Sequence, residues 1–342
     1  MKNNKKHTMA LVVLTICTML VLSSCNLNDA VLKKEPVSKT DFLLNTTCTV
    51  SIYEAKGEKS YEELATEAIE LCRSYEEKLS RTIKNSDVNK INSNKGSYVE
   101  VSEETVFLLD RAIYYSEMSK GKFDVTIGSL AEAWDFNGEN PKVPEEKDIE
   151  NLILGIDYKN ISIKGNTVML AKDSGDIDLG AIAKGFIADK LAEDLKKKYV
   201  SKAIINLGGN VVTVGEKKEN VPWTIGIKKP FTEDGSLVGK VFSEGSSVVT
   251  SGIYERQFEE NGIMYHHVLD VKTGFPAEED LLGVTIISKK SMEGDALATI
   301  CLLLGYEEGR KLVESIDGVE GVFIKKNNEI IATDKSTFVE IK

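Results

Sequence analysis

The stretch AIINLGGNVVTV, residues 203–214, places two adjacent glycines between two runs of apolar and β-branched residues. Residues 203–207 and 211–214 are each long enough for a strand and too short for a helix. A Gly-Gly pair between such runs favours a tight hairpin, because glycine readily adopts the positive φ angles that two-residue turns require. The pattern therefore predicts two antiparallel strands that follow each other directly.

Short runs of the same kind dominate the chain from residue 167 onward. Two long helical patterns interrupt them, at residues 181–198 and 291–304, and a shorter one covers residues 306–316. Strands that follow one another without an intervening helix favour an α+β fold of mainly antiparallel sheets with flanking helices over alternating β-α-β units. The other predicted strands are residues 167–171, 223–228, 240–242, 248–250, 264–269, 282–288, 321–325 and 329–333.

The part of the chain before residue 167 is richer in helix. Residues 48–53 alternate like a strand, and residues 61–79 carry apolar side chains at helical spacing. A second helix is expected from Ser102 to a stop at Gly121, followed by a turn-rich break at residues 137–144. No repeat of 20 to 50 residues is present, so we expect one elaborated domain over residues 41–342.

Residues 1–24 have the pattern of an export signal. Three lysines precede an apolar run over residues 9–22, which is too short to cross about 30 Å of hydrocarbon as a helix. The run ends in Leu-Ser-Ser-Cys, similar to a bacterial lipobox, so we expect Cys25 to carry a lipid; an ordinary secretory signal is the alternative. Residues 25–40 would be a lipidated tether. The protein would then lie on the extracytoplasmic face of the cell membrane, or on the periplasmic side if the cell has an outer membrane.

The charge excludes a nucleic-acid binder. The chain carries −11, and removal of Lys2, Lys5 and Lys6 with the signal gives −11 − 3 = −14 for the remainder. Such a body repels phosphate backbones and anionic lipid alike, so membrane attachment would depend on the lipid anchor. Three further cysteines follow at unrelated spacings, which is neither a disulfide framework nor a zinc pattern, and we expect them to be small buried hydrophobes: Cys48, Cys72 and Cys301.

Five segments carry more Gly, Thr, Asp and His than a core needs. In DLGAIAKG, residues 178–185, a strand runs into a helix whose first N–H groups suit a phosphate, with Lys184 as a charged donor; a plain strand-to-helix turn is the alternative. In MEGDALAT, residues 292–299, Asp295 and Thr299 lie one helical turn apart and could share a hard cation such as magnesium. The others are GKFDVT at 121–126, NLGGN at 206–210, and residues 250–276.

The last of these segments contains His266 and His267. His7 in the export signal is the only other histidine of the chain. Because adjacent residues of a strand face opposite ways, only one of the pair can face a given site. A solvated histidine pair is the alternative interpretation, but Asp270 and the Thr-Gly-Phe-Pro turn at 273–276 favour a functional role.

In this order, the five segments resemble the ApbE family, the FAD:protein FMN transferases, from about residue 45 to the end. The resemblance implies an α+β body with a flavin cleft and a Mg²⁺-dependent transfer. A Thr or Ser hydroxyl of an acceptor protein would attack the FMN phosphorus of FAD, and AMP would leave. Acceptors would be flavoprotein subunits of exported or membrane redox systems.

The family's site residues are carried over by motif. Asp295 and Thr299 would bind magnesium through their side chains, and Ala181 through its carbonyl. His267 would orient the phosphate or take the acceptor's proton. The expected contacts to FAD are Lys122, Phe123, Asp124, Asp178, Lys184 and Leu269.

The chain departs from the family pattern at two positions. Val271 stands where a proline is frequent, which reduces rigidity rather than chemistry. Thr82 stands at a cofactor-facing position where transferases often have an aromatic residue. This leaves two other functions open: a pyrophosphatase that hydrolyses FAD to FMN and AMP, and a non-catalytic lipoprotein that binds flavin.

Overall fold

The computed structural model describes residues 35–138, 141–232, 234–334 and 336–341, and Val37–Lys342 forms one compact unit. The expected export signal, Cys25 and the tether up to residue 34 lie outside the described residues. Among the described helices, none is both long and apolar enough to cross a membrane.

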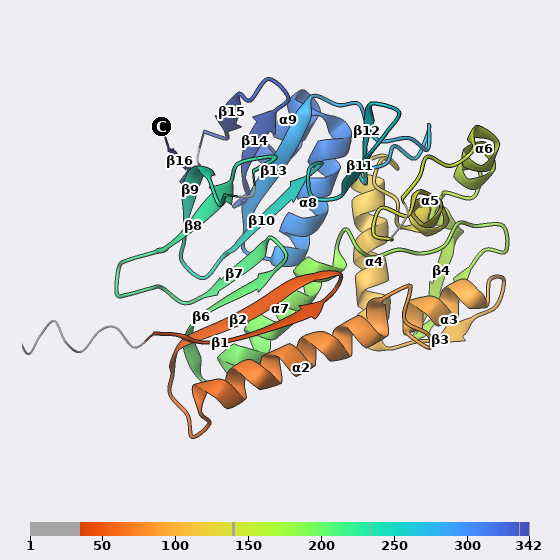
Figure 1. Ribbon diagram of the computed structural model, residues 1–342. Coiled ribbons are helices and arrows are strands. Elements are labelled where there is room, and N and C mark those ends of the chain that lie inside the picture. Colours follow the sequence, from red (N-terminus) through yellow and green to blue (C-terminus); the bar gives the residue numbers. More distant parts are fainter. Residues whose placement is uncertain (1–34, 139–140, 233, 335, 342) are drawn as a thin grey trace, which may run out of the picture. The chain divides into compact units, whose positions relative to one another are not determined.

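An eight-stranded sheet forms the centre of the unit (Figure 1). Neighbouring strands of this sheet pair antiparallel, and the Gly208–Gly209 turn joins the third and fourth strands as a tight hairpin with positive φ at both glycines. The α+β fold with antiparallel sheets is therefore confirmed. In spatial order the strands are β1 (Val37–Leu43), β2 (Thr46–Ala55), β6 (Val200–Leu207), β7 (Asn210–Val214), β10 (Ser247–Gly252), β13 (Leu281–Ser288), β14 (Glu320–Lys325) and β15 (Ile330–Ala332).

Four helices cover one face of this sheet: α2 (Tyr61–Leu79), α7 (Ala183–Lys197), α8 (Ser291–Leu304) and α9 (Tyr306–Glu314). Alternation along β2 turns Cys48, Val50 and Ile52 toward the helices, where all three are fully buried. Cys72 on α2 and Cys301 on α8 are equally buried, as the sequence predicted for all three cysteines.

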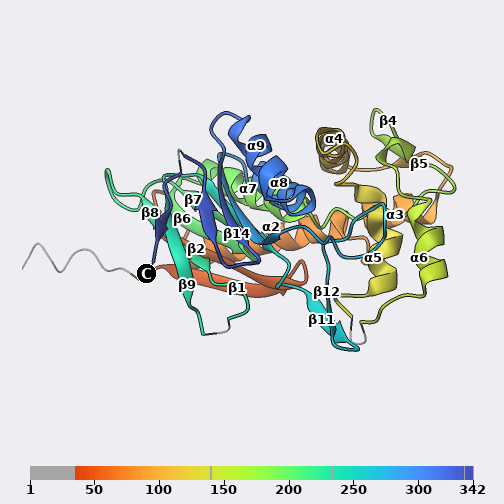
Figure 2. The same cartoon turned by 90° about the horizontal axis from the view of Figure 1, so that it is seen from above.

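A small sheet covers part of the opposite face. It consists of β8 (Trp223–Lys228), β9 (Leu237–Ser243) and β16 (Val339–Glu340), in the order β16-β9-β8. Its apolar residues, including Ile227 and Val241, pack against side chains of β10, β13 and β14 in a separate core. Figure 2 shows α8 and α9 on one side of the strands and β9 on the other.

A third group of elements lies at one end of the sheet, on the right in Figures 1 and 2. Trp134 stacks on Phe136 and also contacts Phe258 and Tyr265, which ties this group to the hairpin β11 (Gln257–Glu260) and β12 (Ile263–His266). The group comprises α3 (Asp87–Ser93), α4 (Glu103–Met118), η1 (Val125–Ile127), α5 (Gly128–Trp134), α6 (Glu146–Ile153), η2 (Tyr158–Asn160), β3 (Val99–Glu100), β4 (Ile161–Lys164) and β5 (Thr167–Leu170).

Two expectations about element bounds were wrong. Residues 37–40, assigned to the tether, belong to β1, where the hydroxyls of Ser38 and Thr40 bond those of Ser51 and Thr49 across the strands. The strand expected over residues 264–269 ends at His266. Beyond it the backbone follows a different partner, because Leu269 bridges to Pro276 in the following turn.

The crossing of α7 and α8 offers a test of the packing. A Cβ atom on Gly185 would lie 2.3 Å from the Ser291 carbonyl oxygen, and both helices are buried there. We expect Gly185→Ala to lower the free energy of unfolding by about 1–3 kcal/mol, as overpacking does. Urea denaturation checks this against Gly57→Ala, whose Cβ would meet only ordinary contacts. Equal stability of the two variants would contradict the crossing.

Candidate active site

A cleft of about 820 Å³ opens between the central sheet, the helices α7 and α8, and the third group of elements, to which α5 belongs. Its size is within the range of cofactor-binding cavities. All five segments singled out in the sequence contribute to its wall. The lining residues from them include Lys122, Phe123, Asp124, Asp178, Gly180, Ala181, Lys184, Asn206, Gly208, Gly209, Thr250, Glu255, Arg256, His267, Leu269 and Thr299.

The expected metal ligands meet at the crossing of α7 and α8. The Asp295 side chain is 1% exposed, and its Oδ2 accepts the Gly185 N–H at 2.8 Å. In an uninterrupted helix this N–H would donate to the carbonyl of Ala181. Among the described residues no hydrogen bond to that carbonyl oxygen is found, and Ala181 lines the cleft, so the oxygen is free to bind a cation.

Lys184 and Thr299 complete this part of the site. The Lys184 ammonium lies 3.4 Å from Asp295 Oδ1 and 3.1 Å from the Gly180 carbonyl oxygen. The Thr299 hydroxyl donates to the Asp295 carbonyl at 3.4 Å, one turn away on α8. No group of three or more His, Cys, Asp or Glu side chains in the described ranges could hold a metal by itself. One carboxylate, one hydroxyl and one carbonyl therefore fit a magnesium ion whose shell water and phosphate complete.

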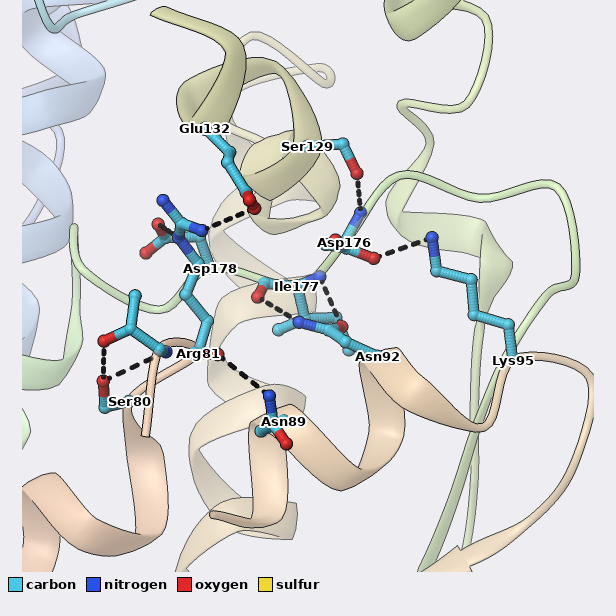
Figure 3. Close-up of polar contacts among 11 residues, drawn as sticks. Ser80, Arg81, Asn89, Asn92, Lys95, Ser129, Glu132, Asp176, Ile177 and Asp178 are labelled. Carbon is cyan, nitrogen blue, oxygen red and sulfur yellow. Dashed lines mark hydrogen bonds and ion pairs between the residues drawn. The ribbon is translucent and has the colours of Figure 1, made fainter. Parts of the chain in front are cut away.

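Asp178 lies next to this site and is fixed by two donors. Arg81 Nε donates to Asp178 Oδ2 at 2.8 Å (Figure 3), and the Gly180 N–H donates to Oδ1 at 2.7 Å. Arg81 also reaches Glu132 on α5, at 3.1 Å. Through Oδ1, Asp178 thus shapes the loop that carries Ala181. Through Oδ2, it holds the Arg81 guanidinium on the cleft wall.

The segment at residues 121–126 lines the cleft with side chains that are largely occupied. Lys122 donates to the carbonyl of Leu303 at 2.8 Å and to Glu279 at 3.3 Å. Asp124 accepts the N–H and hydroxyl of Thr126 and the N–H of Tyr158, at 2.7–2.8 Å. Burial raises the pKa of the Asp124 carboxyl, and these donors oppose the shift. Asp124 therefore orders the cleft wall from within.

The two histidines face opposite ways, as the sequence predicted. His266 is buried and its Nε2 lies 3.2 Å from the carbonyl of Ala277. His267 lines the cleft, and its Nδ1 lies 3.3 Å from the carbonyl of Arg256. Because a carbonyl only accepts, Nδ1 of neutral His267 carries the hydrogen and Nε2 keeps a lone pair. Burial lowers the pKa of His267 to about 3, with the positive charge of Arg256 adding to it.

Comparison with known proteins identifies the chain's relatives. A model of the ApbE family matches residues 44–323. The chain belongs to the ApbE family. It is 30% identical over 334 residues to the FAD:protein FMN transferase of Treponema pallidum (93% of this chain, 91% of the relative), and 37% identical over 273 residues to one from Klebsiella pneumoniae (79% and 84%).

Solved structures of the ApbE family share the fold. The ApbE protein of Thermotoga maritima superposes with a TM-score of 0.81 at 31% identity, covering 88% of this chain and 97% of that one. The flavin transferase ApbE of Vibrio cholerae gives a TM-score of 0.76 at 27% identity, with coverages of 90% and 96%. The ApbE-like α+β fold is therefore confirmed.

One of the residues expected at the ApbE cofactor site lies elsewhere. The structure places Thr82 in an exposed turn, outside the cleft-lining residues, with its hydroxyl 3.0 Å from that of Ser80. Its neighbour Arg81 lines the cleft instead. Leu269, by contrast, is buried in the cleft wall where the family motif predicted it.

Sequence reasoning gave no role to two charged residues of the cleft, Glu255 and Arg81. The surrounding protein raises the pKa of the Glu255 carboxyl through desolvation, although the side chain stays open to the cleft; Lys184 and Arg256 oppose the rise. Charged residues in loops are normally solvated, so the only signal in the sequence was the place of Glu255 within the segment 250–276, three residues after Gly252.

The histidine pair predicts a specific pH response. Burial lowers the folded-state pKa of His266 to about 4 and of His267 to about 3, against about 6.5 in the unfolded chain. The unfolded chain then binds more protons in this window, so stability is lost as pH falls from about 6.5 toward 4. In NMR of the body, neither Cε1 proton should titrate between pH 5 and 8. The His266→Gln variant assigns the two signals. A titration midpoint near 6.5 for either histidine would contradict the burial of its ring.

Proposed function

We propose that this protein transfers FMN from FAD to a Thr or Ser hydroxyl of an acceptor protein and releases AMP. The observation that carries this proposal is the presence of Ala181, Lys184 and Thr299 on one cleft wall, with the buried carboxylate of Asp295 3.4 Å from the Lys184 ammonium. Membership of the ApbE family and the similarity to named FAD:protein FMN transferases support it.

Phosphoryl transfer depends on charge neutralisation and in-line positioning more than on covalent help. When bound, magnesium supplies charge neutralisation and orientation at the pyrophosphate. Lys184 adds a positive charge on the same wall, and its ammonium is already drawn there by Asp295 and Gly180. Lys228 and Arg256 also line the cleft, and neither has an ion-pair partner among the described residues.

His267 is the residue we assign to the attacking hydroxyl. His267 lines the cleft, and because its Nδ1 hydrogen bonds the Arg256 carbonyl, Nε2 keeps a lone pair that can accept a hydrogen bond from the incoming Thr or Ser. The lowered pKa keeps the ring neutral at physiological pH and thus able to accept. It also makes His267 a weak base, which suits orientation of the hydroxyl better than full removal of its proton.

The experiment that tests the activity uses residues 26–342, FAD, magnesium and a candidate flavoprotein subunit with an exposed threonine. AMP release is followed together with flavin fluorescence on the acceptor band of a denaturing gel. AMP with a fluorescent acceptor, both lost on chelation of magnesium, supports transfer. AMP with free FMN and no labelling, across several acceptors, makes the protein a pyrophosphatase. Bound FAD with no AMP makes it a flavin-binding protein.

We also propose that the protein is exported and held at the extracytoplasmic face of the membrane by a lipid on Cys25. The support is the positive, apolar and small-residue pattern of residues 1–25. Its acceptors would then be flavoprotein subunits of exported or membrane redox systems. Labelling by a fatty acid that persists in Cys25→Ser would contradict this attachment.

The metal assignment predicts the behaviour of Asp295→Asn. The amide oxygen can still accept the Gly185 N–H, so the fold should survive, but the negative charge offered to magnesium is gone. We expect AMP release to fall at least about 100-fold. Asp280→Asn is the matched control, because Asp280 caps Tyr306 outside the cleft at 2.9 Å. Near-normal turnover of Asp295→Asn would refute the assignment.

The role of His267 predicts a split between binding and turnover. His267→Ala should slow transfer about 100-fold and leave the Kd for FAD within about threefold, because orientation of the hydroxyl is lost while the phosphate site is intact. His266→Ala serves as the control, since its ring points away toward Ala277. Unchanged transfer kinetics in His267→Ala would make His267 a structural residue.

A further inference from the structure

The start of α8 is held by a carboxylate that belongs to α7. Asp189 Oδ1 accepts the N–H of Ser291 at 2.9 Å, and its Oδ2 accepts the N–H of Met292 at 3.1 Å. The first N–H groups of a helix have no acceptor within the helix and need one from outside. The N-cap residue of α8, Lys290, supplies no side-chain hydrogen bond. Asp189 therefore caps α8 from a neighbouring helix.

Two contacts between α7 and α8 follow the same spacing along both helices, which lie side by side on the central sheet (Figure 1). Asp189 bonds the N–H of Ser291, and Gly185 donates its N–H to Asp295. The two positions on α7 are four residues apart, as are the two on α8, so each pair lies on one face of its helix. Residue numbers rise along α8 as they fall along α7. The two helices are therefore antiparallel here, and one register satisfies both contacts.

The groups that we assign to magnesium lie one turn beyond these contacts, at the cleft. Thr299 follows Asp295 by four residues on α8, and Ala181 precedes Gly185 by four residues; both line the cleft. An α-helix rises about 1.5 Å per residue, so Ser291 and Asp295 are about 6 Å apart along the axis of α8. The first turn also supports Asp295 directly, because in an α-helix its N–H donates to the carbonyl of Ser291. A shift or loss of this turn would therefore move the metal carboxylate.

An ion pair also joins α7 to the residue before α8, but it is a weaker link. Lys290 pairs with Glu193 at 3.0 Å, and the two side chains are 57% and 42% exposed. Ion pairs with this exposure contribute little to stability. Asp189 instead bonds two N–H groups at the positive end of the helix dipole, where a negative charge is most favourable. Burial raises the pKa of the Asp189 carboxyl, and the two N–H donors oppose the rise.

We propose that Asp189 is a positioning residue of the metal site. By capping α8, it fixes the register of this helix against α7 and keeps Asp295 within reach of the Gly185 N–H. The same register brings Thr299 to the cleft wall that contains Ala181. Asp189 is not among the described residues that line the cleft, so its effect passes through α8. We rely on the proposed function only in taking magnesium as the ligand of this site.

The first measurement is the dependence of ADP affinity on magnesium, because ADP carries the pyrophosphate of FAD and has no FMN to transfer. ADP is titrated by calorimetry into residues 26–342 at a series of magnesium concentrations and in EDTA. Asp189→Asn keeps one acceptor oxygen but sets an NH₂ group against the second N–H, so the cap is weakened at nearly constant size. We expect this variant to raise the magnesium concentration for the half-maximal effect about tenfold, while the Kd in EDTA changes less than about twofold.

The second measurement needs neither metal nor FAD. Hydrogen exchange is followed by mass spectrometry in peptides that cover the starts of α7 and α8. We expect Asp189→Asn to speed exchange about fivefold or more in both peptides, because the N–H of Gly185 loses its partner whenever Asp295 moves away. Unchanged exchange at Gly185 would overturn the proposal, since Asp295 would then keep its place without the cap.

Two variants are matched controls. Glu193→Gln removes the exposed ion pair with Lys290 at the same interface and leaves both N–H bonds of Asp189 in place. Asp87→Asn removes a carboxylate that holds the start of another helix, α4, where it accepts the N–H of Ser102 at 2.9 Å. Asp87 is not among the described residues that line the cleft. Neither control should change the magnesium dependence more than about twofold.

A magnesium effect that the wild type and Asp189→Asn share unchanged would refute the role of Asp189 alone. An equal shift in Asp87→Asn would also refute it, because a general loss of stability would then explain the effect. Asp189→Ser removes the carboxylate without the opposed NH₂ group, so the test survives if Asp189→Asn does not fold. If magnesium has no effect on the wild type, the metal assignment of the proposed function is refuted, and the role of Asp189 with it.

Discussion

The Gly185 N–H bond to the buried Asp295 carboxylate is the interaction on which the site depends. It requires α7 and α8 to approach until a single Cβ on Gly185 would collide with the backbone of Ser291. The same bond draws an N–H away from the carbonyl of Ala181, a residue of the cleft wall, and leaves that oxygen without a hydrogen bond among the described residues. Lys184 and Thr299 take their positions from the same two helices. One close helix crossing thus sets the geometry of every group we assign to the metal and the phosphate.

The cationic side chains of the cleft differ in whether a carboxylate is paired with them. Five cationic side chains line it in a chain of net charge −11: Arg81, Lys122, Lys184, Lys228 and Arg256. Two carboxylates neutralise the Arg81 end, whereas Lys228 and Arg256 have no ion-pair partner among the described residues. The field of an acidic body would otherwise repel a dinucleotide, so the locally cationic stretches of the wall define where its phosphates can enter.

Sequence patterns predicted the antiparallel sheets, α2 and α8, and the segments that form the cleft, because each of these depends on local periodicity or on a motif. Short elements such as α3 and α5 escaped notice since tertiary packing, not propensity, stabilises them. Residues 37–40 of β1 were mistaken for tether because an edge strand whose side chains include Ser38 and Thr40 has no apolar pattern. Arg81 could not be placed either, since its partners Asp178 and Glu132 are 97 and 51 residues away in sequence.

The position of β1 has a mechanical consequence. Residues before Val37 join the body at the outer edge of the central sheet, where Val37 pairs with Ile52, while the cleft-lining Asn45 and Thr46 lie at the far end of the same hairpin. The seven residues of β1 are joined by six steps of about 3.4 Å, so the two ends are about 20 Å apart. Traction on the N-terminal segment would load the Val37–Ile52 pair first and unzip the hairpin pair by pair. The edge strand β1 would therefore detach under such a load before the cleft wall is deformed.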